Sequence, residues 1–244
     1  PPTHVCRSLD DYRTRYSAHR LDLDLQEVHR QHAFICVWDD HETANNANST
    51  GAPAHLVEDG PWSLRKTAAQ QAWREWIPAR VGDDGKIWRQ FAFGDLVDLW
   101  MLDTRLWNRD KQTTPKEKAI IADPKRSILG PDQESWLVDG ITSSPARWQI
   151  IGQQVMMGRL GIGASILNTD QWDGYEATRD RLFANIRKYA PGEVVVLTGD
   201  IHTSWANDLV EDSGDAAKYD PKTGIGALAV EFVVPGITSG GLPG

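Results

Sequence analysis

Short apolar runs alternate with longer stretches of helical periodicity through this chain, and this alternation restricts the possible folds more than any other feature. Apolar runs typical of strands occupy residues 32–38, 87–94, 95–105, 147–157, 193–204 and 227–239. Stretches typical of helices occupy residues 8–31, 63–78, 130–141 and 176–190. Because helices and sheets bury their apolar faces against one another, the pattern predicts a layered α/β fold.

The runs at 87–94 and 95–105 are joined by a short turn at Gly94 and Asp95, which predicts a β-hairpin. A hairpin places antiparallel strands in the sheet, so we expect a mixed sheet rather than a purely parallel one. No repeat and no internal boundary interrupts the sequence. A single domain over residues 1–244 is the natural reading at this length. Loops are expected at 43–62, 108–127 and 158–175.

Composition disfavours several classes of function. A formal net charge of −8 opposes binding to the phosphate backbone of nucleic acids, and no nucleic-acid partner is expected. No apolar run is long enough to span a bilayer. Two cysteines, Cys6 and Cys36, define no disulfide framework. The eleven tryptophans indicate a packed globular protein with aromatic-lined clefts.

Two apolar runs end abruptly in residues that can bind metals. FICVW at 34–38 is followed by DDHETANN, and VVVLT at 194–198 is followed by GDIHTS. In open α/β sheets, ligands bind beyond the carboxyl ends of the strands. Carboxylate and amide oxygens suit hard cations, imidazole suits transition metals, and a pair of cations is well adapted to phosphoryl transfer. A single cluster of this kind is more often a cap, a turn or a surface network than a metal site, whereas two at matching strand ends favour a functional site.

The matching stretches LDDYRTRY, VWDDHETANN, FAFGDLVDLWMLDTRLW, ILGPDQESWL, WQIIGQQVMM, DQWDGYEATRDRL, VVVLTGDIHTS and VEFVVPGITSGG run through nearly the whole chain. In this combination and order the chain resembles the alkaline phosphatase D (PhoD-like) family of metallophosphoesterases. The resemblance implies an αββα sandwich with mixed β-sheets and a metal centre at one edge. It implies hydrolysis of small phosphate monoesters or diesters by a metal-activated water. It also implies Fe3+ and Ca2+ as cofactors, with other divalent metals possible, and a periplasmic or secreted parent protein.

The same resemblance assigns roles to individual residues. Asp40, Asn46, Asp200 and His202 take the positions of metal ligands, and His41 takes a catalytic position, contacting the phosphate or protonating the leaving oxygen. For His41 the alternative is a polar neighbour without a catalytic role.

Other polar residues allow two interpretations each. Asp39 caps the turn or supports the metal ligands through a hydrogen bond. Arg105 binds phosphate through two parallel hydrogen bonds or forms a buried network with Asp103. Trp172 lines the substrate cleft or anchors its loop, and Asp173 supports or touches the metal.

The family pattern also contains an upstream acidic or Cys-containing strand end and a Gly-Asp-x-x-Tyr segment, which supply the iron ligands. Gly94-Asp95 is followed by Leu96, Val97 and Asp98, with no Tyr, and comes after DDHE instead of before it. We therefore expect the iron motifs and the first strands of the sandwich to precede residue 1, so that 1–244 is a catalytic-domain fragment truncated at both ends. The alternative function is a non-catalytic domain that binds calcium or another ligand on the same fold.

Overall fold

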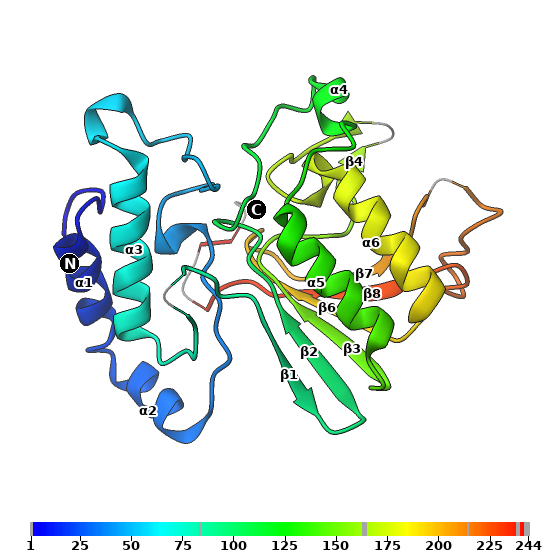
Figure 1. Ribbon diagram of the computed structural model, residues 1–244, viewed down its shortest axis with the longest axis horizontal. Coiled ribbons are helices and arrows are strands. Elements are labelled where there is room, and N and C mark those ends of the chain that lie inside the picture. The colour runs from blue at the N-terminus through cyan, green and yellow to red at the C-terminus, as the bar shows by residue number, and fades with distance from the viewer. Residues whose placement is uncertain (1, 83, 163–164, 214, 238–239, 242–244) are drawn as a thin grey trace.

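The computed structural model describes all residues except 1, 83, 163–164, 214, 238–239 and 242–244 (Figure 1). The helices are α1 (Leu9–His19), α2 (Leu23–Gln31), α3 (Trp62–Trp76), α4 (Lys118–Ile121), α5 (Gly130–Ser143) and α6 (Glu176–Tyr189), with short 3-10 turns η1 (Asp40–Glu42), η2 (Val57–Asp59) and η3 (Trp172–Gly174). The strands are β1 (Arg89–Phe93), β2 (Val97–Met101), β3 (Trp148–Gly152), β4 (Gly161–Ile162), β5 (Ser165–Ile166), β6 (Val194–Thr198), β7 (Trp205–Leu209) and β8 (Ala229–Val233).

Six of these strands form one mixed sheet in the order β1-β2-β3-β6-β8-β7. The four central strands are parallel, and the edge strands β1 and β7 pair antiparallel with their neighbours. The mixed α/β architecture and the β1–β2 hairpin predicted from sequence are therefore confirmed. Among the described residues the only other sheet is the β4–β5 hairpin, so the second large sheet of a sandwich is not found there.

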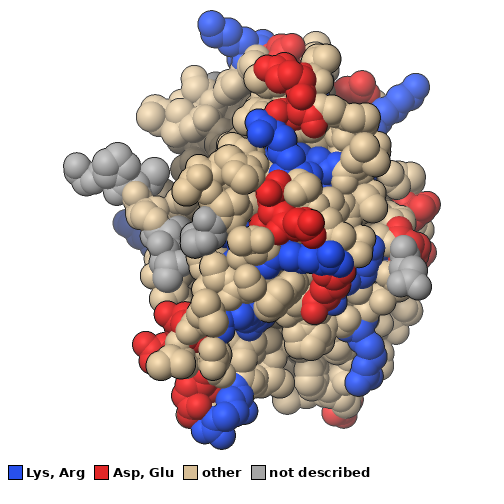
Figure 2. Space-filling model, turned by 90° about the vertical axis from the view of Figure 1, so that its left-hand side faces the viewer, with Lys and Arg blue, Asp and Glu red and all other residues tan. Residues whose placement is uncertain are grey.

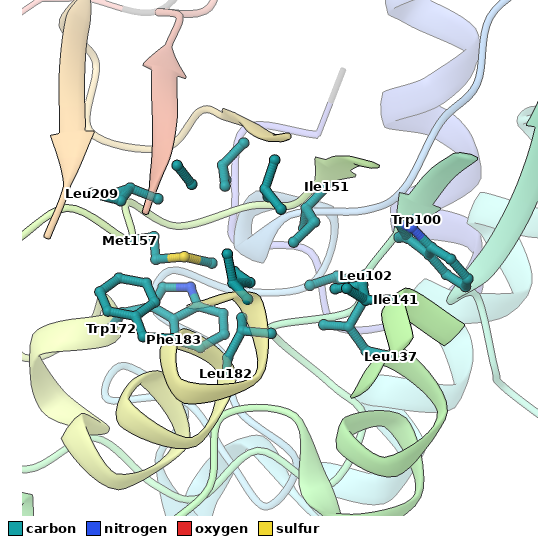
Figure 3. Packing of buried hydrophobic residues seen from close by; sticks show 14 of the residues in the cluster. Trp100, Leu102, Leu137, Ile141, Ile151, Met157, Trp172, Leu182, Phe183 and Leu209 are labelled. Carbon is teal, nitrogen blue, oxygen red and sulfur yellow. The ribbon is translucent and has the colours of Figure 1, made fainter. Parts of the chain in front are cut away.

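One face of the sheet is covered by α5 and α6 (Figure 1). Trp100, Ile151 and Val196 lie in adjacent strands at paired positions and point to this face. They pack with Leu137 of α5, Leu182 of α6 and other buried side chains in the main core (Figure 3). Each Å² of apolar surface that this packing removes from water stabilises the domain by about 25 cal/mol.

The opposite face of the sheet is only partly covered. Leu99, Ile150 and Val195 occupy paired positions one residue away from the core row and are half-buried, while Leu197 and Phe232 farther along are exposed. Apolar side chains on both faces of a sheet are typical of a sheet that is packed on both sides. This is the face that a second sheet of an αββα sandwich would cover.

A separate helical layer stands beside the sheet and contains α1, α2 and α3 (Figure 1). Its core joins Trp38 and Trp73, whose rings meet edge to face at 5.2 Å between centroids, with Ile87 and Leu106 from the sheet side. Trp38 therefore anchors the chain immediately before Asp39 and Asp40.

Several expected elements differ from the structure. The predicted helix 8–31 is two helices, because Asp22 caps a new helix by accepting the N–H of Leu25 at 2.7 Å. The predicted strand 32–38 is wrong: the segment pairs with no strand in the described part of the chain, and Phe34 is 48% exposed. Strand β7 and the β4–β5 hairpin were missed.

Two expected strands also ran too far at their carboxyl ends. The structure ends β2 at Met101 and β3 at Gly152, whereas β6 ends at Thr198, where the sequence predicted a break at Gly199-Asp200. In each case the residues beyond the strand leave the ladder and bind polar partners at the sheet edge. The overestimate has a physical cause, since apolar residues continue into these loops and only tertiary contacts end the strand.

Replacing Gly140 by Ala tests the packing of α5 on the sheet. A Cβ there would lie 2.3 Å from Trp100 Cη2, and the Trp100 ring is held by a 2.8 Å hydrogen bond from its Nε1 to Gln149. Helix propensity alone would stabilise the variant by about 1 kcal/mol, but overpacking costs about 1–3 kcal/mol. We expect a net loss of stability in urea unfolding. Gly51→Ala, with nothing within 4 Å of the new Cβ, is the control, and equal stability of both variants would contradict the packing argument.

Candidate metal centre

The loops that leave β2, β3 and β6 begin at the same edge of the sheet, because these strands are parallel neighbours. Arg105 follows β2, Gln154 follows β3 and Asp200 follows β6. In open α/β sheets this carboxyl edge is where ligands bind. The sheet itself therefore brings these three side chains to one place.

Asp39 and Asp40 reach this edge from the helical layer, in the turn η1. The Asp39 carboxylate accepts the N–H of Asp40 at 2.9 Å, and Glu42 accepts the N–H of Asp39 at 2.6 Å. This reciprocal capping closes the turn, so Glu42 has a local structural role. The turn is also tied to the helical layer, since the Tyr12 hydroxyl donates to the carbonyl of Thr43 at 2.6 Å.

Asp39, Asp40 and Asp200 form one group of carboxylates. Each offers an oxygen, and these oxygens lie within 4.8 Å of one another. Asp40 is oriented by two backbone N–H donors, from His41 at 2.8 Å and from Asn46 at 2.7 Å. Oxygen ligands gathered in this way suit a hard cation. The sequence suggested Asp39 as a supporting residue. In the structure, Asp39 offers a carboxylate oxygen to this group just as Asp40 does.

Arg105 is buried in the middle of this group. Its Nε donates to Asp39 at 2.7 Å, and its two terminal nitrogens donate to Asp170 at 2.7 Å and Asp200 at 2.5 Å. Its side chain has no exposed surface, so in this structure it contacts carboxylates and not solvent. Asp103 supports it through the backbone by accepting the N–H of Arg105 at 2.9 Å.

A second buried arginine completes the network. Arg109 donates to Asp170 at 2.7 Å, and Gln112 donates to the same oxygen at 2.6 Å. Burial alone would raise the pKa of Asp170, but Arg109 and Arg105 outweigh it and lower the pKa to about 2. Arg109 and Gln112 carry no local sequence signal for a site, because they lie in the charged and polar segment 108–127, which is typical of a surface loop.

The network holds more negative than positive charge, since four aspartates face two arginines. Burial raises the pKa of Asp200 to about 7. The Arg105 guanidinium opposes this rise, whereas the carboxylates of Asp39, Asp170 and Asp40 add to it. A bound cation would supply the positive charge that this arrangement lacks.

The backbone around the cluster is also unusual. The described residues include four non-glycine residues with positive φ, and three of them are Asn46 (53°), Asp200 (67°) and His202 (61°). Left-handed backbone at non-glycine residues costs free energy and is concentrated at functional sites. All three were predicted as metal ligands. For Asn46 the structure gives a definite contact, the backbone N–H to Asp40; its amide ligand role stays a prediction.

The two predicted histidines lie at the exposed rim. His41 has 70% of its side chain exposed, with its Nε2 4.0 Å from a carboxylate oxygen of Asp40. His202 is exposed in the turn after Asp200. Among the described residues, the group of ligand atoms within 4.8 Å contains neither imidazole.

Trp172 and Asp173 lie away from the rim, in the core. Trp172 has no exposed surface and donates from Nε1 to Gln153 at 3.0 Å. Asp173, also fully buried, binds Arg179 of α6 at 2.7 Å and the N–H of Leu160 at 2.7 Å. These positions favour the reading in which Trp172 anchors its loop, and they give Asp173 the same structural role.

Comparison with known proteins agrees with this geometry. A family profile described as PhoD-like phosphatase matches residues 1–244. The chain belongs to the PhoD-like phosphatase family. It is 37% identical to alkaline phosphatase D of Bacillus subtilis (strain 168) over 248 residues, which cover 96% of this chain and 41% of that protein. A solved structure described as the structure of PhoD matches with a TM-score of 0.85 and 34% identity, covering 96% of this chain and 46% of that one.

The chain thus spans less than half the length of the relatives it matches. Family membership and the mixed α/β fold are established, and the acidic cluster provides a plausible place for a metal.

Replacing Asp170 by Asn tests the charge network. The variant leaves Arg105 and Arg109 buried with one carboxylate fewer, and breaking a buried pair from one side costs about 3 kcal/mol or more. Asp170 has a depressed pKa, so its contribution is complete above about pH 4 and declines as the pH falls toward 2.

Chemical denaturation at pH 7 and near pH 3 measures this effect. We expect wild type to exceed Asp170→Asn in stability at pH 7 and the gap to narrow in acid. Exposed Asp10→Asn is the control and should differ from wild type by less than about 0.5 kcal/mol. A gap that is absent at pH 7, or that widens in acid, contradicts the network.

Proposed function

We propose that this chain carries a metal site of a phosphoric ester hydrolase and acts on phosphate monoesters or diesters, as in alkaline phosphatase D. The observation that carries the proposal is the convergence of the Asp39, Asp40 and Asp200 carboxylates within 4.8 Å at the sheet edge. Membership of the PhoD-like phosphatase family supports the class of reaction.

Calcium is the cation that we propose for this cluster, with other hard divalent ions as alternatives. The donors that converge are carboxylate oxygens, and flexible all-oxygen sites are typical of calcium. Asn46 and His202, at the edge of the cluster, are proposed as further ligands. Ferric iron is carried over from the family resemblance and would need the additional ligands described for the family.

The chain's own residues divide the work of the reaction. A cation bound by the three aspartates would polarise the phosphoryl group and lower the pKa of a water molecule. His41 is exposed beside Asp40, so it is accessible to a substrate, and we propose that it binds the phosphate or donates a proton to the leaving oxygen. Arg105 holds Asp39 and Asp200 in place. Phosphate binding by Arg105 would require it to leave its carboxylate partners.

A small phosphate ester is the substrate class that we propose, with no nucleic acid. On the face that includes α1, α2 and α3, basic and acidic side chains are intermingled (Figure 2). Extended polyanions are bound best by continuous basic strips, so this mixture favours a small substrate. We also propose a periplasmic or secreted location for this protein. Among the described residues, no helix combines the length and apolar character needed to cross a bilayer.

The alternative is a non-catalytic domain that binds calcium through the same cluster. Family membership favours the hydrolase over this alternative. The two are separated by measuring calcium-dependent thermal stabilisation together with hydrolysis of p-nitrophenyl phosphate and bis-p-nitrophenyl phosphate. Stabilisation without turnover of either ester would support the binding domain.

Substitution of Asp40 by Asn should weaken metal binding by more than about 100-fold, because it removes a ligand charge, whereas even indirect contacts to metal ligands contribute about 10- to 100-fold. Isothermal titration with calcium measures the affinity. Asp10→Asn, at an exposed helical position, is the matched control. Unchanged affinity in Asp40→Asn would place the metal elsewhere.

Substitution of His41 by Gln should lower kcat by about 100-fold or more, because general acid–base groups contribute about 10²–10⁴. Calcium affinity should stay within a few-fold of wild type, since His41 is not a proposed ligand. Exposed His32→Gln is the control. If the His41→Gln variant hydrolyses the ester with the same kcat as wild type, His41 has no catalytic role.

A further inference from the structure

Gln154 occupies the central loop at the carboxyl edge of the sheet. The strand order β2-β3-β6 places the loop after β3 between the loop that carries Arg105 and the loop that carries Asp200. Gln154 is the second residue of this central loop and is buried. A polar side chain that is buried at this position needs hydrogen-bond partners from the neighbouring loops.

The Gln154 side chain uses both ends of its amide for this purpose. Its Nε2 donates to the carbonyl of Trp38 at 2.8 Å and to the carbonyl of Leu102 at 2.9 Å. Its Oε1 accepts the backbone N–H of Thr104 at 2.9 Å and the Thr104 hydroxyl at 2.6 Å. The amide therefore makes four hydrogen bonds to segments that are distant in sequence, which is its full capacity.

Three of the residues that Gln154 contacts lead directly into the cluster. Trp38 immediately precedes Asp39, and Thr104 immediately precedes Arg105. The backbone carbonyl of Gln154 also accepts the N–H of Gly199 at 3.1 Å, and Gly199 immediately precedes Asp200. Gln154 thus contacts the chain directly before Asp39 and Arg105 through its side chain, and directly before Asp200 through its backbone.

The segment that carries Asp39 and Asp40 has particular need of such a contact. Residues 32–38 pair with no strand in the described part of the chain, so no sheet ladder fixes their register against β2. The hydrogen bond from the Gln154 side chain to the Trp38 carbonyl ties the end of this segment to the carboxyl edge of the sheet, while Arg89 of β1 holds the segment farther back through the Cys36 carbonyl at 2.7 Å.

We propose that Gln154 is the positioning residue of the metal centre, setting the distance between the Asp39–Asp40 turn and the Arg105 and Asp200 loops. It touches no cluster carboxylate through its side chain and acts through the backbone of the residues that carry the cluster. The proposal deepens the proposed function and rests on it for its effect on metal binding and hydrolysis, but the backbone contacts stand independently.

Gln149 provides a matched control in β3, the strand that precedes the loop of Gln154. It is buried like Gln154 and makes three side-chain contacts, accepting from Trp100 Nε1 at 2.8 Å and donating to Ser144 at 2.8 Å and Ala146 at 3.0 Å. Ser144 and Ala146 precede β3 at the end opposite the cluster, and the Trp100 ring belongs to the main core under α5. Loss of either glutamine removes a buried amide network, but only Gln154 contacts the residues that lead into the metal site.

The experiment compares Gln154→Met with Gln149→Met in calcium affinity, ester hydrolysis and hydrogen exchange. For Gln154→Met we expect calcium affinity to fall about 10- to 100-fold, the usual effect of losing a contact that orients metal ligands. We expect a matching fall in kcat at saturating calcium with KM changed less. Amide exchange should accelerate together in residues 38–46 and 102–106. Gln149→Met should leave metal affinity, kcat and exchange in both segments close to wild type.

Two results would overturn the proposal. The first is that both variants lose metal affinity in proportion to their loss of thermal stability, which would make Gln154 a purely structural residue. The second is unchanged exchange in residues 38–46 of Gln154→Met. If the Met variants do not fold, Gln154→Glu and Gln149→Glu replace them, since the former keeps the Oε1 acceptor for Thr104 and loses both donated N–H bonds; the same results are expected.

Failure of the proposed function gives a different outcome. If wild type binds no metal and hydrolyses neither ester, the metal site is wrong, whereas the exchange measurement still decides the role of Gln154. If wild type is active and exchange in the two segments is unaffected by Gln154→Met, the function stands and the positioning role is overturned.

Discussion

The rest of the site depends on the ion pairs that the buried Arg105 guanidinium makes with its carboxylate neighbours. Arg105 binds Asp39, Asp170 and Asp200, which come from three separate parts of the chain. Like-charged carboxylates repel one another when they are brought together in a poorly solvated place. Arg105 offsets this repulsion, and because one cation faces several anions, the cluster keeps an excess of negative charge that a metal ion can use.

Two supports hold the groups around Arg105. The parallel strands β2, β3 and β6 deliver Arg105, Gln154 and Asp200 to a common edge by hydrogen-bonded register. The Asp39–Asp40 turn is instead held by side chains, through the packing of Trp38 on Trp73 and the amide of Gln154. Arg105 and Asp200 are therefore positioned by the strands of the sheet, whereas Asp39 and Asp40 are positioned by individual side-chain contacts. The positions of Asp39 and Asp40 are the more sensitive to single substitutions.

Sequence reasoning succeeded where the signal was local. The change from apolar to polar residues marked the two motifs, the family resemblance assigned Asp40 and Asp200 within them, and the structure brings both carboxylates into one group. The same signal was misread at 32–38, where apolar residues indicated a strand that has no partner among the described residues. Gln153 and Gln154 also follow an apolar run, directly after β3, but side-chain amides are weak indicators of metal chemistry.

The sequence by itself determined the alternation of helices and strands, the hairpin of β1 and β2, the family resemblance and the two polar motifs that contain Asp40 and Asp200. These depend on periodicity and on residue types at short spacing, which a linear chain displays directly. Only the tertiary structure decided that Asp39 joins the cluster, that Arg105 and Arg109 are buried with Asp170, and that Trp172 lies in the core. Those outcomes depend on which distant segments become neighbours, and burial and charge pairing arise only once the neighbours are in place.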